Sequence, residues 1–166
     1  MYLSESKKTP PFMLVILVLA GLLFGLLFSR IFFFPYIITD SAMEPNLKPK
    51  ETIIISKMGS PERNKIIACE HPTQNDTVFL RRVIGIPGDT IEIRNKRIFV
   101  NRRKLSFSWK IKQTDARSLP VLFTFRDTMP LIKLSKDEYF IIGDNLDYSM
   151  DSRTYGVIKK NLLIGT

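Results

Sequence analysis

The residues of this 166-residue chain that could carry chemistry lie in three short stretches far apart in the sequence. Thr39–Leu47 holds a carboxylate, a hydroxyl and a proline, and Arg81–Asp89 places two arginines before a turn rich in Gly and Pro. Gly143–Arg153 contributes carboxylates, serines and an arginine. Attack by a hydroxyl needs a group that takes its proton and donors that stabilise the developing oxyanion. The hydroxyl-bearing and charged residues of these stretches are therefore the first candidates for a site.

The order and spacing of the three stretches resemble those of the type I signal peptidases, membrane-bound serine proteases that use a Ser–Lys dyad. In that family the nucleophile immediately precedes the Met of a Ser-Met-x-Pro motif, which Met43 and Pro45 match here. In this register the nucleophile position falls on Ala42 and the lysine position falls on Arg81. The resemblance therefore implies the family's fold and peptide groove, with both reacting groups replaced.

Ser41 is the neighbouring hydroxyl and the possible substitute nucleophile. Pro45 disfavours a helix, so the sequence predicts an edge strand that runs into a turn over Thr39–Leu47. Successive side chains of a strand point to opposite faces, so Ser41 is expected to face away from the direction of Ala42. A local bulge would re-aim it, and without one Ser41 is an ordinary surface serine.

Arg81 is a poor replacement for a catalytic lysine. Burial can lower the pKa of a lysine from about 10.4 to near neutrality, whereas arginine starts at about 12.5–13.8 and normally stays charged and paired. Lys57 and Lys65 are open as substitute bases, although neither matches the dyad position. Asp40 stands where some members of the family carry a hydroxyl that helps bind the oxyanion, and a carboxylate there repels a developing negative charge.

Other residues match the family's supporting positions. Ser149 falls where a hydroxyl orients the lysine amine, and Asp151 and Arg153 are expected to form a structural ion pair near the site. Asp144 is expected to serve a turn and a salt bridge. The remaining motif positions are Met43, Pro45, Gly85, Pro87, Gly88 and Asp89. The glycines among them allow φ values closed to other residues, so a structural role is enough to explain them.

The composition restricts the partners. A formal net charge of +9 and a pI near 9.8 indicate an anionic neighbour, and because no stretch resembles a nucleic-acid-binding module, we expect membrane phospholipids and no nucleic acid. Cys69 is the only cysteine and His71 the only histidine. An intrachain disulfide and a His-based zinc cluster are therefore excluded. We expect neither a metal nor another cofactor.

One segment is apolar enough to cross a membrane. Residues 12–29 carry no charge, and with the apolar residues after Arg30 they can span about 30 Å of hydrocarbon. We expect a cytoplasmic tail at residues 1–11, an anchor at 12–35 and an extracytoplasmic domain at 36–166. A cleaved secretory signal would end at small residues of the Ala-x-Ala kind, which are missing. Basic residues flank both ends of this segment, so the charge bias does not decide which end is cytoplasmic. The family resemblance implies that the soluble domain lies on the outer face of the plasma membrane.

The soluble part is predicted to be mainly β, a folded sheet or barrel built from short strands and Gly/Pro turns. The expected strands are residues 52–55, 66–69, 78–84, 90–93, 97–101, 105–109, 121–125, 139–142 and 155–158. The fourth and fifth of these are predicted to form a hairpin. Basic residues cluster around it: Arg94, Lys96, Arg97, Arg102, Arg103 and Lys104. They form either a solvated face or a contact for anionic headgroups.

Two functions follow from these observations. The first is a catalytically silent relative that binds an extended peptide by strand addition at an open sheet edge. Some Gram-positive members of the family lack the dyad and are thought to assist surface-pilus assembly, which implies a segment of an exported or pilus protein as the partner of a monomer. The second is an active signal peptidase that removes signal peptides from exported preproteins with Ser41. The residues Ala42 and Arg81 favour the first function.

Overall fold

The computed structural model describes residues 10–74, 77–117 and 119–166. The chain divides into two compact units, Met1–Phe34 and Pro35–Thr166. Most of the predicted tail, residues 1–9, lies outside the described residues. The prediction of a mainly β protein preceded by one apolar helix is confirmed.

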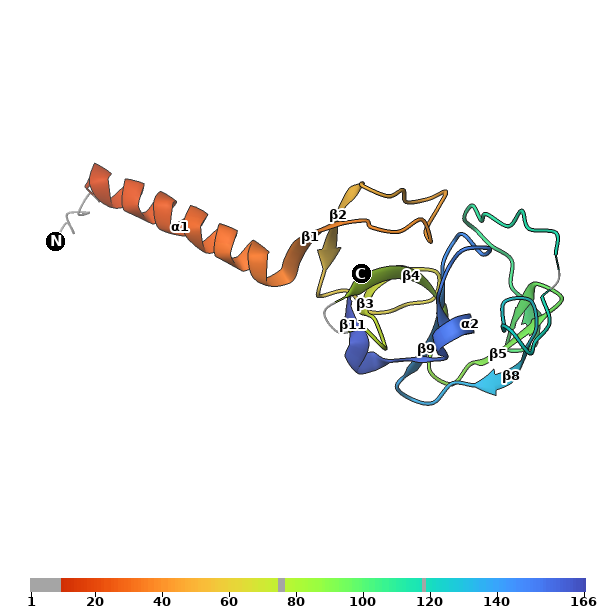
Figure 1. The fold of residues 1–166 in the computed structure, drawn as a ribbon. Coiled ribbons are helices and arrows are strands. Elements are labelled where there is room, and N and C mark those ends of the chain that lie inside the picture. Colours follow the sequence, from red (N-terminus) through yellow and green to blue (C-terminus); the bar gives the residue numbers. More distant parts are fainter. Residues whose placement is uncertain (1–9, 75–76, 118) are drawn as a thin grey trace. The chain divides into compact units, whose positions relative to one another are not determined.

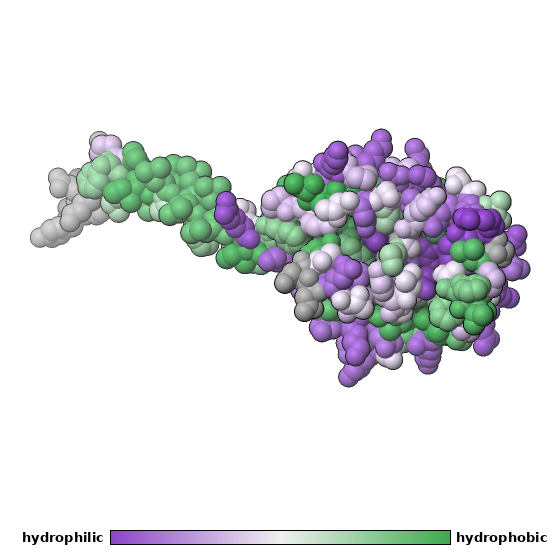
Figure 2. All heavy atoms as spheres, in the orientation of Figure 1, coloured by the Kyte–Doolittle hydropathy of each residue, from purple (hydrophilic) through white to green (hydrophobic). Residues whose placement is uncertain are grey.

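The apolar segment forms helix α1 (Pro11–Phe32), in which no residue is buried in the isolated chain. Pro11 stands in the first turn, where its missing N–H costs no hydrogen bond, and the backbone turns extended at Phe33. Its 22 residues measure about 33 Å at 1.5 Å per residue, and an 18-residue window within them has a mean hydropathy of 2.8. Figure 2 shows mostly hydrophobic side chains along the visible face of the helix. By length and composition α1 can cross a membrane.

The soluble unit is organised around a five-stranded antiparallel sheet with β4 at its centre (Figure 1). The strand order is β10 (Ile158–Lys159), β9 (Glu138–Ile142), β4 (Val78–Gly85), β3 (Ile66–Glu70) and β11 (Leu163–Gly165). A short 3₁₀ helix, η1 (Lys160–Leu162), links β10 to β11. Almost every residue of β4 is buried, because neighbouring strands and packed segments cover both of its faces.

A second antiparallel sheet carries the predicted hairpin. Its order is β7 (Arg103–Lys104), β6 (Arg97–Val100), β5 (Thr90–Arg94) and β8 (Met129–Lys133). In β5 the burial alternates along the strand, so that Ile91 and Ile93 enter the core while their neighbours face outwards. β1 (Phe33–Ile37) and β2 (Thr52–Ser56) form a separate two-stranded sheet.

Two apolar clusters form the core. The larger one joins the two main sheets and contains Ile84, Ile91, Ile93, Ile98, Met129, Leu134, Phe140, Ile142 and Leu146. The other lies on the opposite side of the five-stranded sheet and includes Ile67, Cys69, Phe79, Val83, Tyr139, Ile141 and Ile158. Because successive residues of β4 and β9 alternate between the two clusters, these two strands hold the domain together.

Three of the predicted strands are wrong. Residues 105–109 are irregular, because after Leu105 donates to Ile98 the chain packs Phe107 and Trp109 on the core without pairing. Residues 121–125 form an exposed turn. Residues 155–158 are interrupted because Asp151 caps the short helix α2 (Ser152–Tyr155), which ends at Gly156 with φ 81°. Strands β1, β7, β8 and β11 were not predicted.

The core position of Phe140 gives a test of this packing. Phe140 is fully buried between the sheets, so Phe140→Ala should lower the free energy of unfolding by about 3–5 kcal/mol. Phe123→Ala, at an exposed turn, is the matched control and should leave stability nearly unchanged. Denaturant unfolding of the full chain in detergent measures both, and equal stabilities would contradict the core described here.

Candidate active site

The first and third motif stretches meet the start of β4 at one cleft of about 300 Å³. Its walls come from the turn after β1, from the β3–β4 connection, from β4 itself and from the loop before α2. The lining residues are Thr39, Asp40, Ser41, Ala42, His71, Gln74, Thr77, Val78, Phe79, Arg81, Tyr148, Met150 and Tyr155. The structure thus brings both dyad positions, Ala42 and Arg81, to one place.

The predicted edge strand over Thr39–Leu47 is wrong, because the chain forms hydrogen-bonded turns here instead. The amide of Glu44 donates to Ser41 O at 3.2 Å, and those of Asn46 and Leu47 donate to Met43 O at 3.1 and 3.0 Å. Met43 is completely buried, and the bond before Pro45 is cis. Strand alternation therefore does not separate Ser41 from Ala42, and both line the cleft.

Asp40 connects the two dyad positions. Its Oδ1 accepts the backbone N–H of Ala42 at 3.2 Å, and its Oδ2 accepts Nη1 of Arg81 at 3.0 Å. In the register set by Met43 and Pro45, that N–H belongs to the nucleophile position, whose amide would otherwise be available to an oxyanion. A carboxylate of the protein itself already occupies this donor. The sequence shows that Asp40 is acidic, but not that it is bonded to both positions.

Arg81 is buried, and its guanidinium is fully engaged. Nη1 donates to Leu80 O at 2.6 Å as well as to Asp40, and Nε and Nη2 donate to Met150 O at 3.1 and 3.0 Å. The group also lies over the Phe79 ring, 4.9 Å from its centroid. A guanidinium has no lone pair with which to take a proton, and here its donors face carbonyl and carboxylate oxygens.

No proton acceptor in the described part of the cleft is hydrogen-bonded to Ser41. His71 lines the same cleft, but its Nε2 is 2.9 Å from Tyr155 Oη, and its Nδ1 is 3.3 Å from both N and Oγ1 of Thr73. Among the described residues, no hydrogen bond joins Ser41 Oγ to a basic side chain. The only interaction of Ser41 with the third motif is through its carbonyl, which accepts Asn145 Nδ2 at 3.2 Å.

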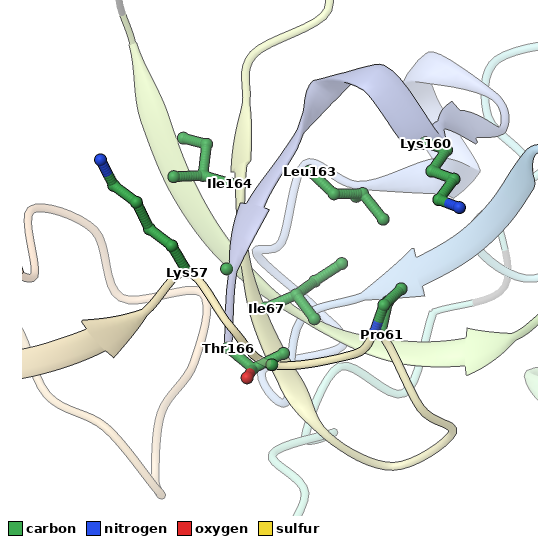
Figure 3. Close-up of a pocket in the computed structure, with 9 residues that line it drawn as sticks. Lys57, Pro61, Ile67, Lys160, Leu163, Ile164 and Thr166 are labelled. Carbon is green, nitrogen blue, oxygen red and sulfur yellow. The ribbon is translucent and has the colours of Figure 1, made fainter. Parts of the chain in front are cut away.

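The two lysines considered as substitute bases lie elsewhere. Lys65 forms an exposed salt bridge with Glu62 at 3.0 Å. Lys57 lines a different hollow of about 160 Å³, formed with β3, β11 and the chain end. In Figure 3 its amine extends away from the apolar residues Ile67 and Leu163. Neither lysine lines the cleft that contains Ala42.

Asp144 is buried and pairs with Arg82, a residue that the sequence analysis missed. Arg82 donates from Nε and Nη2 to the two oxygens of Asp144 at 2.8 and 2.7 Å, and its guanidinium stacks on Trp109 at 4.5 Å. Asn46 Nδ2 also donates to Asp144 at 2.7 Å. Strand alternation would have predicted that Arg81 and Arg82 point to opposite faces of β4. Asp144 therefore ties the first and third motifs to the far side of this strand.

Asp151 and Arg153 form a fully buried bidentate pair beside the cleft, with N–O distances of 2.9 and 2.8 Å. Asp151 also accepts the amides of Gly143 at 3.0 Å and of Arg153 at 3.1 Å. Burial alone would raise the pKa of Asp151, but the charge and hydrogen bonds of Arg153 and the Gly143 amide outweigh it and lower the pKa. The pair therefore holds the third motif in shape while both groups stay charged.

Ser149 lies against Gly143 in the loop between β9 and α2. A Cβ added to Gly143 would come within about 2.5 Å of Ala42 O, so only glycine lets the third motif approach the nucleophile position this closely. The hydroxyl of Ser149 is buried, and within the described residues no partner meets hydrogen-bond geometry with it. The expectation that this hydroxyl orients a basic side chain stays a prediction, since among the described residues no hydrogen bond joins Ser149 to Arg81.

The turn after β4 is held by contacts of Asp89 with three other parts of the chain. Asp89 accepts the Ile86 amide at 2.8 Å, pairs with Arg63 at 2.8 Å and accepts Asn101 Nδ2 at 2.7 Å. Gly88 has a φ of 89°, which a side chain rarely tolerates. This turn, with Gly85, Pro87, Gly88 and Asp89, thus joins the two main sheets and does not line the cleft.

In the part of the chain that the structure describes, no cluster of three or more His, Cys, Asp or Glu side chains could hold a metal ion.

The buried Asp151–Arg153 pair yields a stability prediction with a pH dependence. Asp151→Asn leaves Arg153 without its counter-charge and should lower the free energy of unfolding by about 3–5 kcal/mol at neutral pH. Because the folded pKa of Asp151 is lowered, its contribution is complete above the unfolded value of about 3.9 and is lost as the pH falls through the folded pKa. The difference between the two proteins should therefore shrink below about pH 4.

The matched control is Glu92→Gln, which breaks the solvent-exposed pair with Arg94 and should cost at most about 1 kcal/mol. Denaturant unfolding at several pH values measures all three proteins. An Asp151→Asn protein as stable as the parent would show that the pair does not support the fold.

Comparison with known proteins leads to the same family as the three motifs. A family model described as signal peptidase, peptidase S26, matches residues 11–166. Signal peptidase I P of Bacillus subtilis subsp. natto is 34% identical over 89% of this chain and 82% of its own length. Signal peptidase I of Bacillus amyloliquefaciens is 27% identical over 98% and 91% of the two chains, and signal peptidase IB of Staphylococcus aureus is 31% identical over 79% and 73%.

Among solved structures, a signal peptidase I from Enterococcus faecalis matches with a TM-score of 0.49 and 26% identity, covering 65% of this chain and 97% of that one. The family model extends from the first residue of α1 to the last residue of the sequence, and the Bacillus subtilis relative is similar over most of both chains. The chain therefore belongs to the signal peptidase S26 family.

Proposed function

We propose that this chain is a catalytically silent signal peptidase relative that binds an extended segment of an exported or pilus protein and assists surface-protein assembly. The observation that carries the proposal is the Asp40 carboxylate, which is bonded to the Ala42 amide and the Arg81 guanidinium at once. Ala42 offers no nucleophile, and Asp40 occupies both the amide of that position and the guanidinium at the base position. The alternative, an active peptidase using Ser41, lacks a base that is hydrogen-bonded to Ser41 among the described residues.

The peptide-binding part of the proposal is supported by an incompletely paired strand. β4 pairs with β3 over Val78–Arg82, but with β9 only from Arg82 onwards. Within the described residues, the Val78–Arg81 segment therefore has no strand partner on its second side, and this segment borders the cleft. The carbonyl of Val78 accepts the Tyr36 hydroxyl at 2.7 Å, which marks one end of the open segment. An extended peptide could add here as a further strand.

Helix α1 supports a proposal for the location of the protein. One apolar helix before the domain is consistent with a single-pass membrane protein, and signal peptidases of this kind process proteins during export. We propose a plasma-membrane protein whose soluble domain lies on the outer face, where exported segments emerge.

The silent site predicts how activity can be rebuilt. The natural protein should not cleave a preprotein, and Ala42→Ser should add a nucleophile without a base. Ala42→Ser with Arg81→Lys should remain hindered, because Asp40 would still occupy the amide and would pair with the new lysine. Adding Asp40→Ser should free both groups and exceed Ala42→Ser alone by about 10²–10⁴-fold, the usual worth of general-base assistance. Groups that act as a unit are strongly non-additive.

Preprotein cleavage by the natural chain and these variants in detergent, at equal concentration, measures this series. Brisk cleavage by the natural protein that Ser41→Ala abolishes would overturn the proposal in favour of the active peptidase. If the triple variant stays silent although it is folded, the inference that the cleft keeps the family's geometry is wrong.

Peptide binding is tested by obstructing the cleft. Ser41→Trp places a large side chain in the cleft wall. It should weaken binding of a fluorescent alanine-rich peptide, with the sequence of a preprotein cleavage region, by about tenfold, or about 1.4 kcal/mol. Ser108→Trp, at an exposed position outside the cleft, is the matched control and should bind as the parent does. Fluorescence anisotropy with the full chain in detergent gives both affinities, and equal binding by all three proteins would place the peptide elsewhere.

A further inference from the structure

Positive charge gathers on residues 94–104 of the second sheet without a full counter-charge from the domain. In the register of β5 and β6, Arg97 lies directly opposite Arg94, and both side chains are exposed. Arg94 has a partner in Glu92 at 3.3 Å. Like charges placed opposite each other on a sheet are destabilising, so this surface favours an anionic partner. Four of its exposed cations form no ion pair with a carboxylate among the described residues: Arg97, Arg102, Arg103 and Lys104.

A hollow of about 410 Å³, called here the basic hollow, lies among these cations. Basic side chains of β6, of β7 and of the turn before β6 line it, namely Arg97, Lys104 and Lys96. The chain that follows β7 adds apolar side chains to its wall: Leu105, Phe107 and Ile111. These three pack on the larger core cluster and are only partly buried. The basic hollow therefore combines positive charge with an apolar surface that is open to a ligand.

The acidic residues nearest to the basic hollow do not neutralise it. The Lys96 amide donates to Asp127 O at 2.8 Å, and its Nζ donates to Asp115 O at 2.6 Å, so Lys96 contacts two carbonyls. The carboxylates of Asp115 and Asp127 are already paired with Arg117 and Arg126, at 2.8 to 2.9 Å. These two anions and two cations balance one another, and the charges of the basic hollow stay uncompensated.

The backbone at the edge of β7 is open as well. β7 is the last strand of its sheet, and within the described residues it pairs with β6 alone. The Leu105 amide donates to Ile98 O at 2.8 Å. Because neighbouring residues of an antiparallel ladder alternate in direction, the N–H and C=O of Lys104 point away from β6. An extended chain that adds at this edge would run beside the basic hollow.

An extended acidic peptide offers carboxylates, apolar side chains and backbone hydrogen bonds together, whereas a phosphate polymer offers charge without apolar side chains. We propose that the basic hollow binds an extended acidic segment of a protein partner. Its carboxylates pair with Arg97 and Lys104, and its apolar side chains lie against Phe107 and Ile111. The basic hollow and the cleft that contains Ala42 have no lining residue in common, so this inference does not rest on the proposed function.

Binding is measured by fluorescence anisotropy with the full chain in neutral detergent and short labelled peptides. One peptide alternates Glu and Val, a second alternates Gln and Val, and a third alternates Glu and Ser. The Gln–Val peptide should bind about tenfold more weakly than the Glu–Val peptide, because its amides form no ion pairs. The Glu–Ser peptide should also bind more weakly, because it buries no apolar side chain. Equal binding of all three peptides would overturn the proposal.

Substitutions in the protein locate the site. Arg97→Gln with Lys104→Gln should weaken binding of the Glu–Val peptide by about tenfold. The matched control is Lys136→Gln with Lys159→Gln, which removes the same charge from exposed positions outside the basic hollow and should bind as the parent does. Equal weakening by both double variants would show a general charge effect and contradict a defined site.

A charge exchange gives a result that a misfolded protein would not produce. Arg97→Glu with Lys104→Glu should lose the Glu–Val peptide and gain a peptide that alternates Lys and Val. Ser41→Trp should leave Glu–Val binding unchanged, and its loss there would place the peptide in the cleft instead. Inorganic polyphosphate that displaces the Glu–Val peptide as well as the unlabelled peptide does, at equal charge, would overturn the assignment to a peptide.

Discussion

Two adjacent arginines on the central strand, each neutralised by a carboxylate from a distant part of the chain, determine how this domain is assembled. Arg81 meets Asp40 on the cleft side, and Arg82 meets Asp144 on the other side. A guanidinium is effectively always charged, so burying it in a strand core requires an oxygen-rich partner of matching geometry. These two pairs draw the turn after β1 and the loop after β9 onto β4. The cleft lies where the three segments meet.

The same constraint supports the proposal that the site does not hydrolyse peptides. A lysine at position 81 could lose its proton at moderate cost and serve as a base, whereas arginine retains its proton and needs an anion beside it. Asp40 supplies that anion, and in doing so its second oxygen takes the Ala42 amide. The replaced base and the occupied amide are therefore two aspects of one arrangement, to which Ala42 adds the missing hydroxyl. The Asp151–Arg153 pair, by contrast, keeps the surrounding loop folded and makes no contact with Asp40 or Arg81 among the hydrogen bonds of the described residues.

Much of this could be predicted from the sequence, and the parts that could not have physical reasons. Short runs of apolar and β-branched residues bounded by turn residues predicted β2 to β6 and β9. Such runs are informative because residues that are buried on a sheet are apolar in a pattern typical of strands. The apolar run of residues 121–125 was misleading, because it resembles a strand yet belongs to an exposed turn beside the Arg126–Asp127 pair. Met43 and Pro45 gave the register of the site. The bridging by Asp40 and the stacking of Arg82 on Trp109 depend on contacts between distant segments, which no local pattern reveals.

The Asp40–Arg81 pair also has an evolutionary consequence. Arg81 is almost entirely buried, whereas Asp40 is partly open to the cleft. If Asp40 alone reverted to a hydroxyl residue, a charge in the interior would lose its counter-ion, and if Arg81 alone became lysine, the two bonds to the Met150 carbonyl would be lost with no nucleophile gained. Each single replacement is expected to cost stability, so the two residues can be exchanged with little loss only together. Folding energetics alone would therefore favour keeping the pair, whatever reaction the site does or does not carry out.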